Sequence, residues 1–260
     1  MRDDFTDTHC HFDFPPFSGH EVESLALAER VGVRKIIVPA VTADRFVRVL
    51  KLAHDYPPLF AALGLHPLYI AQHHEPHLEQ LAAFLASQPP KLVAVGEIGL
   101  DLTMENPQFE RQQRLLHAQL ALAKQHRLPV ILHSRRTHDQ LAAVLCRLAL
   151  PRCGVVHGFA GSWSQAQAFV RLGYYIGVGG TISYPRAQKT RSVMAQLPLS
   201  SLLLETDAPD MPLAGYQGQP NRPERIAEVF QVLCSLRPEP ADEIADHLQR
   251  NAQALFALSF

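Results

Sequence analysis

Residues 92–135 read LVAVGEIGLDLTMENPQFERQQRLLHAQLALAKQHRLPVILHSR. Within this stretch, apolar runs predict strands over Leu92 to Val95 and Pro129 to Leu132, and an apolar stripe with helical spacing predicts a helix over Phe109 to Gln125. Continuously apolar runs are typical of strands that are covered on both faces, as in parallel sheets. The stretch therefore predicts one β–α–β unit of a parallel sheet.

The same alternation continues outward along the chain. The predicted strands are Phe5 to Thr8, Lys35 to Pro39, Leu59 to Leu65, Leu92 to Val95, Pro129 to Leu132, Gly154 to Val156, Tyr174 to Val178 and Leu202 to Leu204. The predicted helices are Val22 to Val31, Ala43 to His54, His77 to Ala86, Phe109 to Gln125, Gln140 to Leu148, Ser164 to Leu172, Arg191 to Leu197, Pro223 to Leu236 and Ala241 to Ala257. Eight such repeats favour an α/β fold, a (β/α)8 TIM barrel, in a single domain over residues 1–260. A doubly wound sheet is the alternative, and no glycine-rich nucleotide-binding motif supports it.

Composition bounds the class of protein. The chain has 260 residues, of which 47% are hydrophobic and 19% are charged, so we expect a large buried core rather than disorder. The formal net charge is −1 with histidine neutral, which excludes a general attraction for nucleic acid or anionic membranes. Any phosphate binding must therefore be local.

The first residues and the cysteines predict the compartment. The start, MRDDF, is charged and lacks the apolar segment of a signal peptide, and no apolar run approaches the ~20 residues that a membrane helix needs. The four cysteines are scattered without a Cys-x-x-Cys pair, which favours reduced thiols. We expect a cytoplasmic protein without a membrane partner or an obligate protein partner.

Residue types that bind metals follow most of the predicted strands. The first strand is followed by His9 and His11, the fourth by Glu97, the fifth by His133, the sixth by His157, and the eighth by Glu205 and Asp207. In a (β/α)8 barrel, the carboxyl ends of the strands meet at one face, where the catalytic loops gather. We therefore expect these side chains to converge, and this convergence is stronger evidence than any single motif.

His9 and His11 are suited to bind one cation, and Glu97 is suited to bridge that cation to a second one. His9 and His11 are two apart on an extended segment, so both point to one face while Cys10 points away. They can chelate one ion or form an incidental surface pair. Glu97 can bridge two cations with its two oxygens, or form a salt bridge at a helix start.

The remaining residues complete a site for two ions. His133 and His157 suit the second ion, although either one alone is more often a hydrogen-bonded core histidine. Asp207 can ligate the first ion and accept a hydrogen bond from a bridging hydroxide, and Glu205 can support a ligand or act as one. Mixed imidazole and carboxylate ligands suit Zn²⁺ or Mn²⁺, whereas Mg²⁺ prefers oxygen. The set predicts two divalent cations per chain, Zn, Mn or Mg, whose bridging hydroxide attacks a phosphoryl group.

These motifs resemble the TatD family of metal-dependent deoxyribonucleases, within the wider amidohydrolase-like barrels. The matching segments run in order along nearly the whole chain: 7–11 (DTHCH), 64–67 (GLHP), 95–101 (VGEIGLD), 109–112 (FERQ), 128–135 (LPVILHSR) and 204–209 (LETDAP). The segments 11–17 and 218–223 point most closely to the YjjV-like branch of that family.

The resemblance implies a fold, an activity and residue roles. It implies a TIM barrel of the metal-dependent hydrolase type and metal-dependent DNA hydrolysis, often from a 3′ end. It also implies that His66 lies in the substrate site. The metal ligands that it implies are His9, His11, Glu97, His133, His157 and Asp207. The sequence departs from the family pattern at Arg136, Gly158 and 221–223 (NRP), which are not predicted ligands, so the departures concern the substrate.

Cations and aromatic residues in the predicted catalytic loops are candidate contacts for a nucleic acid. Arg135 is the strongest phosphate candidate because it lies close to His133. The other cations, which also fit ordinary solvated charge, are Arg136, Arg186, Lys189, Arg191, Arg222 and Arg225. The loop aromatics, which can stack on unpaired bases or pack against the fold, are Phe14, Phe17, Phe159 and Trp163. We expect a DNA partner with single-stranded or frayed ends rather than a long duplex.

Three functions are compatible with these observations. The leading one is a deoxyribonuclease that cleaves phosphodiester bonds at DNA ends in a 3′–5′ exonuclease manner, with Asp207, Glu97 and His66 catalytic and with His66 and Arg135 contacting substrate. The alternative is an amidohydrolase-type hydrolase of a small amide, lactone or phosphoester on the same barrel. The third is a non-enzymatic binding protein, which a complete ligand set without a structural need for metal disfavours.

Overall fold

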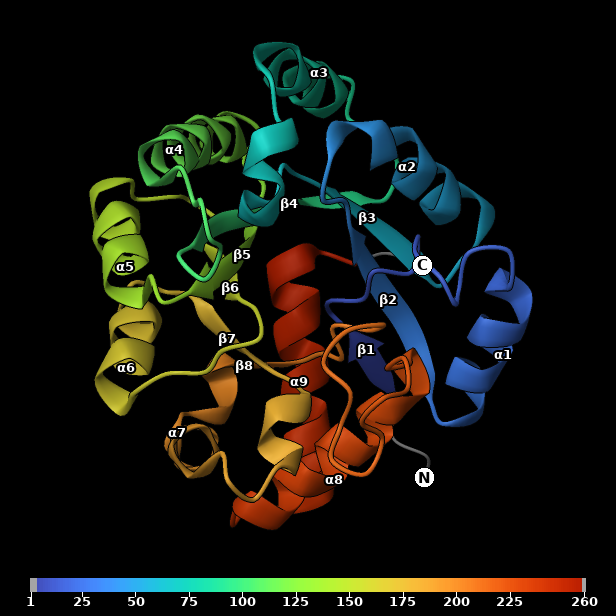
Figure 1. Cartoon of the computed structure of the whole chain (residues 1–260). Helices are drawn as coiled ribbons and strands as arrows, with labels where there is room; N and C mark the ends of the chain where they lie inside the picture. Colours follow the sequence, from blue (N-terminus) through green and yellow to red (C-terminus); the bar gives the residue numbers. More distant parts are fainter. Residues whose placement is uncertain (1–3, 259–260) are drawn as a thin grey trace.

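The computed structural model describes residues 4–258 and contains one sheet of eight parallel strands in sequence order, from β1 (Phe5–Asp7) to β8 (Leu202–Leu204). Backbone hydrogen bonds close the sheet into a barrel, because Thr8 N–H donates to the Leu204 carbonyl at 3.1 Å and Asp207 N–H donates to the His9 carbonyl at 2.8 Å. Most of the helices surround this barrel (Figure 1). The predicted (β/α)8 barrel is confirmed.

The elements follow the predicted order. The other strands are β2 (Val33–Pro39), β3 (Leu59–Leu63), β4 (Leu92–Asp101), β5 (Val130–Arg135), β6 (Gly154–Val156) and β7 (Tyr175–Val178). The helices are α1 (Glu21–Arg30), α2 (Phe46–Asp55), α3 (Glu75–Ala86), α4 (Phe109–Gln125), α5 (His138–Arg147), α6 (Trp163–Arg171), α7 (Gln188–Gln196), α8 (Ile226–Leu236) and α9 (Ala241–Phe256). Short 3-10 helices lie in the connections, among them η2 (Pro67–Gln72) after β3. The predicted helices lie within a few residues of those in the structure.

Strand β4 is longer than its apolar run predicts. It pairs with β5 as far as Asp101 and Arg135, so Glu97 and His133 lie inside paired strands rather than after them. Gly99 makes this possible, because its φ is +151° and a Cβ built there would lie 1.9 Å from the His133 carbonyl oxygen. Only glycine fits at that approach, so β4 and β5 remain paired at the level of the site.

The barrel interior is a packed core at the end opposite the carboxyl ends of the strands. Phe60, Val93 and Leu203 from the strands pack with Leu255 and Phe256 of α9, which is seen within the ring of strands in Figure 1. A second apolar layer fills the space between the strands and the surrounding helices. The polar site therefore occupies only the carboxyl-terminal end of the barrel. Among residues 4–258, no helix has both the length and the apolar character to cross a membrane.

Candidate metal centre and active site

A cavity of about 640 Å³ opens at the carboxyl ends of the strands. The predicted ligands that line it are His11, Glu97, His133, His157 and Asp207, and His66 and Arg135 line it as well. His9 is fully buried beside His11. The structure thus brings the predicted metal ligands together with His66 and Arg135 at one end of the barrel.

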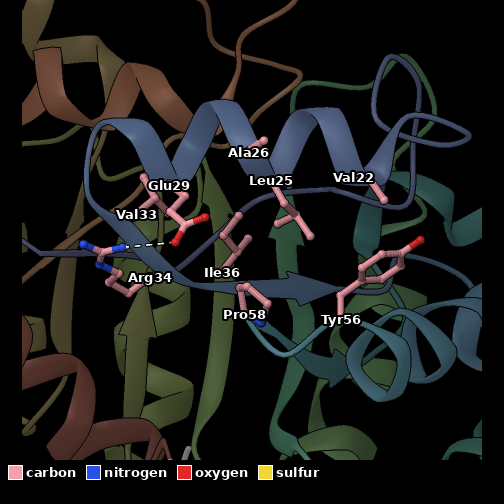
Figure 2. Close-up of a pocket in the computed structure, with 9 residues that line it drawn as sticks. All are labelled: Val22, Leu25, Ala26, Glu29, Val33, Arg34, Ile36, Tyr56 and Pro58. Atoms are coloured by element: carbon pink, nitrogen blue, oxygen red, sulfur yellow. Dashed lines mark ion pairs between the residues drawn. The ribbon is translucent and has the colours of Figure 1, made fainter.

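A second hollow, of about 340 Å³, lies between α1 and β2 (Figure 2). Its lining is mainly apolar and includes Leu25, Ile36 and an ion pair in which Arg34 Nη1 lies 3.5 Å from Glu29 Oε1. The potential metal-binding groups found among the described residues include none of its lining side chains. We therefore place the candidate active site in the larger cavity.

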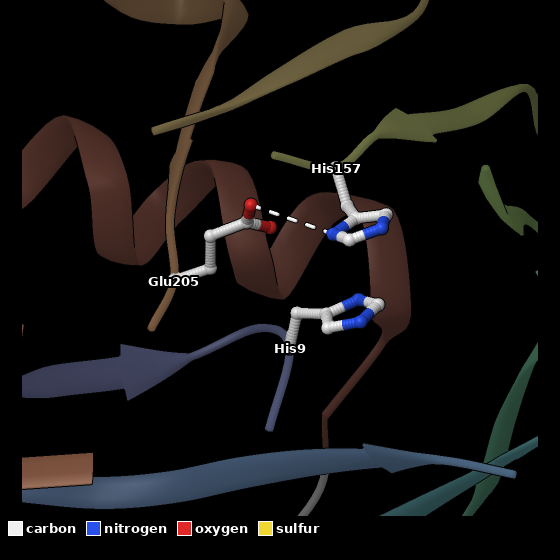
Figure 3. A group of neighbouring side chains, drawn as sticks. All are labelled: His9, His157 and Glu205. Carbon is white, nitrogen blue, oxygen red and sulfur yellow. Dashed lines mark ion pairs between the residues drawn. The ribbon is translucent and has the colours of Figure 1, made fainter. Parts of the chain in front are cut away.

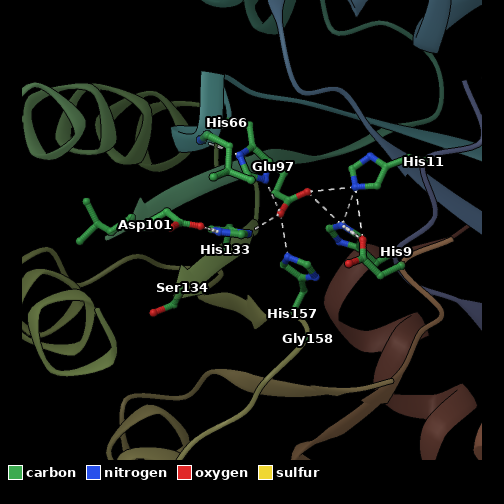
Figure 4. A network of polar contacts seen from close by, with 12 residues as sticks. His9, His11, His66, Glu97, Asp101, His133, Ser134, His157 and Gly158 are labelled. Carbon is green, nitrogen blue, oxygen red and sulfur yellow. Dashed lines mark hydrogen bonds and ion pairs between the residues drawn. The ribbon is translucent and has the colours of Figure 1, made fainter. Parts of the chain in front are cut away.

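The first half of the site surrounds one oxygen of Glu97, a side chain only 1% exposed (Figure 4). Glu97 Oε2 lies 3.0 Å from His9 Nε2 and 3.3 Å from His11 Nε2, and Asp207 Oδ1 lies 3.4 Å from both nitrogens. Ligands about 2.0–2.2 Å from one tetrahedral zinc ion lie about 3.3–3.6 Å from one another, close to the distances in this group. Glu97 Oε2 also lacks a hydrogen-bond partner, so this group of atoms fits a cation.

The second half surrounds the other oxygen of Glu97. Glu97 Oε1 lies 2.7 Å from His157 Nε2, 2.9 Å from His66 Nε2 and 3.1 Å from His133 Nδ1. The two oxygens of one carboxylate therefore face separate groups of imidazoles. Burial acts to raise the pKa of Glu97, but the imidazoles of His157, His66 and His9 outweigh it and hold this pKa well below its usual range. Glu97 is thus kept ionised, as a ligand must be.

His66 differs from His133 because its protonated nitrogen is the one that faces Glu97. Burial lowers the pKa of His66 to about 4, so its ring is neutral near pH 7. Its Nδ1 accepts a hydrogen bond from the backbone N–H of Leu68 at 3.0 Å, so the proton must lie on Nε2, which faces Glu97. A protonated nitrogen donates hydrogen bonds and cannot bind a metal. His66 forms a potential metal-binding group with Glu97 and His133, but this tautomer does not ligate. A contact between His66 and substrate stays a prediction.

Asp101 is a functional candidate to which the sequence analysis gave no role. Its Oδ2 lies 2.5 Å from His133 Nε2, and its Oδ1 accepts from Thr103 N–H at 2.7 Å. Burial acts to raise the pKa of Asp101, but the hydrogen bonds from His133 and Thr103 lower it to about 2. The carboxylate fixes the His133 proton on Nε2 and turns Nδ1 toward Glu97, the arrangement found behind metal-binding histidines. Alternation along β4 from Glu97 was the signal that could have found it.

Glu205 lies beside the candidate ligands His9 and His157 (Figure 3), and it does not line the cavity. Its Oε1 accepts the backbone N–H of Gly158 and lies 3.6 Å from His157 Nδ1, too far for a hydrogen bond. A Cβ built at Gly177 would lie 2.6 Å from Glu205 Oε2, so glycine at this position leaves room for the carboxylate. A supporting role for Glu205 stays a prediction.

The candidate nucleic-acid contacts separate into two groups. Arg135 and Arg136 are exposed and line the cavity. The other arginines contact protein groups elsewhere: Arg186 lies over Tyr184, Arg191 donates to the Ile182 carbonyl, Arg222 pairs with Glu224, and Arg225 lies over Tyr216. Lys189 is exposed but does not line the cavity. Among the predicted cations, only Arg135 and Arg136 line it.

None of the aromatic candidates is both exposed and part of the cavity lining. Phe17 and Phe159 pack against the fold, the other possibility given for these aromatics, because both side chains are buried in the core. The Arg45 guanidinium lies 3.6 Å from the centre of the Phe14 ring and covers it. Trp163, at the start of α6, is exposed but does not line the cavity. Periodicity does not show the orientation of single loop residues, so the sequence could not separate these cases.

Comparison with known proteins identifies the family to which the chain belongs. The family model described as TatD related DNase matches residues 6–257. The chain belongs to the TatD family. The Escherichia coli (strain K12) protein named uncharacterized metal-dependent hydrolase YjjV is 67% identical over 252 residues, which cover 97% of each chain. The Edwardsiella piscicida protein named 3′-5′ ssDNA/RNA exonuclease TatD is 33% identical over 251 residues, 94% of this chain and 95% of the relative.

A solved structure agrees with this assignment to the TatD family. The crystal structure of the Escherichia coli K12 TatD homologue YjjV superposes with a TM-score of 0.98 at 66% identity, covering 100% of both chains. The prediction of a metal-dependent hydrolase of the TatD family is therefore confirmed, and its His/Glu/Asp clusters are suited to metal ions.

Cys10 provides a test of side-chain direction in this TatD-family site. The side chain is fully buried in the apolar core between two candidate ligands, and burial raises the pKa of its thiol. Cys10→Ser is expected to retain most of the bound metal and activity while the melting temperature falls, because a hydroxyl replaces a thiol in an apolar environment. Elemental analysis and thermal unfolding measure this. Loss of metal from a folded variant would show that Cys10 is a ligand.

Proposed function

We propose that this TatD-family protein is a divalent-metal-dependent deoxyribonuclease that removes nucleotides from single-stranded or frayed DNA ends in the 3′–5′ direction. The observation that carries the proposal is the position of Glu97, whose two oxygens face separate imidazole groups in a cavity with Arg135 and Arg136 at its edge. A relative that is 33% identical is named a 3′-5′ ssDNA/RNA exonuclease, which supports this substrate class.

The proposed centre holds two divalent cations that share Glu97. One ion is assigned to His9, His11 and Asp207, and the other to His133 and His157. Such ions lower the pKa of a bound water to about 7 and offset the negative charge of a phosphate. All of these residues lie in the strands of one closed sheet or within a few residues after them, so we propose that the chain acts as a single domain. A cytoplasmic location remains a prediction from the sequence.

The cavity suits the end of a strand. Its volume of about 640 Å³ lies within the roughly 300–1,000 Å³ of sites that enclose small ligands. Leu68 and Met211, which are 45% and 44% exposed, line it and offer apolar contacts for an unpaired base. Arg135 and Arg136 offer bidentate contacts for the phosphates. A long duplex would need a charged surface outside this cavity, and the net charge of −1 does not provide one.

His66→Ala tests the proposed division between metal binding and substrate contact. Turnover is expected to fall about 100-fold, the scale of losing one donor to a developing negative charge, while both ions stay bound. Steady-state kinetics and elemental analysis measure the two effects, with exposed His117→Ala as the matched control. If His66→Ala lost an ion, His66 would be a ligand and the tautomer argument would fail.

Arg135→Ala tests phosphate binding at the end of β5. KM is expected to rise with little change in kcat, because the contact is the same in the ground state and the transition state. The dependence of binding on salt concentration should also weaken, since fewer counterions are released. Exposed Arg147→Ala on α5 is the control. A fall in kcat at unchanged KM would instead assign Arg135 to the chemical step.

The deciding experiment is digestion of short single strands labelled at either the 3′ or the 5′ end. Metal-stripped protein is given Mg²⁺, Mn²⁺ or Zn²⁺ and is compared on DNA, RNA, duplexes and panels of esters and amides. Stepwise loss of 3′ nucleotides from single strands supports the proposal. Metal-loaded protein that hydrolyses an amide or lactone but leaves every strand intact would favour the amidohydrolase alternative.

A further inference from the structure

Helix α4 supplies no candidate ligand, yet it carries two buried glutamines that reach toward the site. Gln112 and Gln119 are 0% and 1% exposed. They are seven residues apart, which is two helical turns, so both lie on one face of α4. Burying a primary amide is costly unless its hydrogen bonds are satisfied, and here both side chains bind backbone.

Gln119 holds the segment that carries His66. Its Oε1 accepts the backbone N–H of Leu65 at 2.7 Å, and its Nε2 donates to the carbonyl of the same residue at 3.2 Å. Pairing between β3 and β4 ends at Leu63 and Val95, so the backbone beyond this point needs other partners. Gln119 thus takes the place of a neighbouring strand one residue before His66.

Gln112 does the same for Asp101. Its Oε1 accepts the backbone N–H of Asp101 at 2.8 Å, and its Nε2 donates to the carbonyls of Asp101 at 2.9 Å and Pro107 at 2.7 Å. Asp101 in turn accepts the hydrogen bond from His133 Nε2 at 2.5 Å. A continuous chain of hydrogen bonds therefore runs from the interior face of α4 to a candidate metal ligand.

A third contact from the same helix supports His66 from its other side. Arg111 Nη2 donates to the carbonyl of His73, and His73 Nε2 donates to the carbonyl of His66 at 2.8 Å. The backbone on both sides of the Leu65–His66 peptide is therefore held by groups that α4 fixes in place.

We propose that Gln112 and Gln119 are positioning residues: Gln112 orients His133 through Asp101, and Gln119 fixes the segment that presents His66. This inference rests on the proposed roles of His133 as a ligand and His66 as a substrate contact. Its consequence is that two substitutions on one helix face have different effects. Loss of the Gln112 amide weakens metal binding, and loss of the Gln119 amide slows turnover.

The test uses the full-length protein with Gln112→Met, Gln119→Met and the control Gln113→Met. Methionine keeps the length of glutamine and removes the amide, and Gln113 is a half-buried neighbour on the same helix. The affinity for Mn²⁺ is measured by calorimetry on metal-stripped protein, and kcat and KM are measured on a chromogenic phosphodiester. We expect Gln112→Met to bind one of the two ions about tenfold more weakly, at the lower end of the effects of groups that support ligands. We expect Gln119→Met to bind both ions normally with kcat about tenfold lower.

Two results would overturn the inference. One is a lower melting temperature in both variants with metal affinities and kcat equal to those of Gln113→Met, which would make the glutamines merely structural. The other is an equal effect of Gln112→Glu and Gln119→Glu on both the affinity for Mn²⁺ and kcat. These variants are the alternative if a methionine variant does not fold, because they keep the accepting oxygen and lose the donated bond. If the unaltered protein bound two ions but cleaved no phosphodiester, the proposed function would fail, and the Mn²⁺ affinity of Gln112→Met would still decide the positioning role.

Discussion

Glu97→Gln is expected to lose at least one of the two metal ions of the proposed centre. Both Glu97 oxygens face imidazole nitrogens at 2.7–3.3 Å, so the amide would place an N–H₂ group where one of these oxygens now lies. An amide nitrogen is a hydrogen-bond donor and does not ligate, and the negative charge that offsets the two cations is also removed. Elemental analysis after mild purification is expected to find up to two divalent ions per chain in the unaltered protein and fewer in the variant.

The control for this loss is Glu110→Gln, which makes the same chemical change on the exposed side of α4. Circular dichroism of the metal-free proteins verifies that both variants are folded. A Glu97→Gln protein that held two ions with unchanged affinity would show that Glu97 does not bridge them.

Asp207→Asn is expected to lower kcat by at least ~100-fold, as when a key electrostatic group is removed from an active site. Asp207 Oδ1 lies 3.4 Å from Nε2 of both His9 and His11. We assign Asp207 to ligate the first ion and to accept a hydrogen bond from the attacking water. Asn has the same shape but a neutral side chain. Steady-state kinetics on a short labelled strand, with metal content checked, measures the effect.

The backbone makes asparagine the appropriate substitution at this position. Asp207 has a φ of +60°, a left-handed conformation that asparagine tolerates better than most residues. Alanine there would add backbone strain to the loss of the carboxylate and confuse the result. If Asp207→Asn kept near-normal kcat with both ions bound, the chemical role assigned to Asp207 would be wrong.

Most of the fold and the convergence of the central side chains of the site could be predicted from the sequence. Short apolar runs between helical stripes predicted the barrel, because strands that are covered on both faces are continuously apolar. Placement after successive strands then predicted that His9, His11, Glu97, His133 and Asp207 converge, and the structure brings them together. Their roles as ligands stay predictions.

Other features depend on tertiary contacts that local patterns do not encode. The run Gly96-Glu97-Ile98-Gly99 has no strand-like alternation, so the extension of β4 to Asp101 was not predicted. Glutamine is typical of exposed helix positions, so the sequence does not show that Gln112 and Gln119 are buried. The tertiary structure shows that both bind backbone groups. The state of His66 depends on one hydrogen bond from Leu68, which spacing does not reveal.

The closure between β1 and β8 has a consequence for assembly of the barrel. It joins residues such as Thr8 and Leu204, which are 196 positions apart, so forming it carries a large loop-closure entropy. His9 and His11 lie on one side of this seam and Asp207 on the other, and a cation shared by them would act as a clip across it. Chelation should then loosen the seam before the rest of the barrel. Faster amide exchange at Thr8 and Asp207 than in β4 or β5 would be the sign that metal loading and barrel closure are coupled.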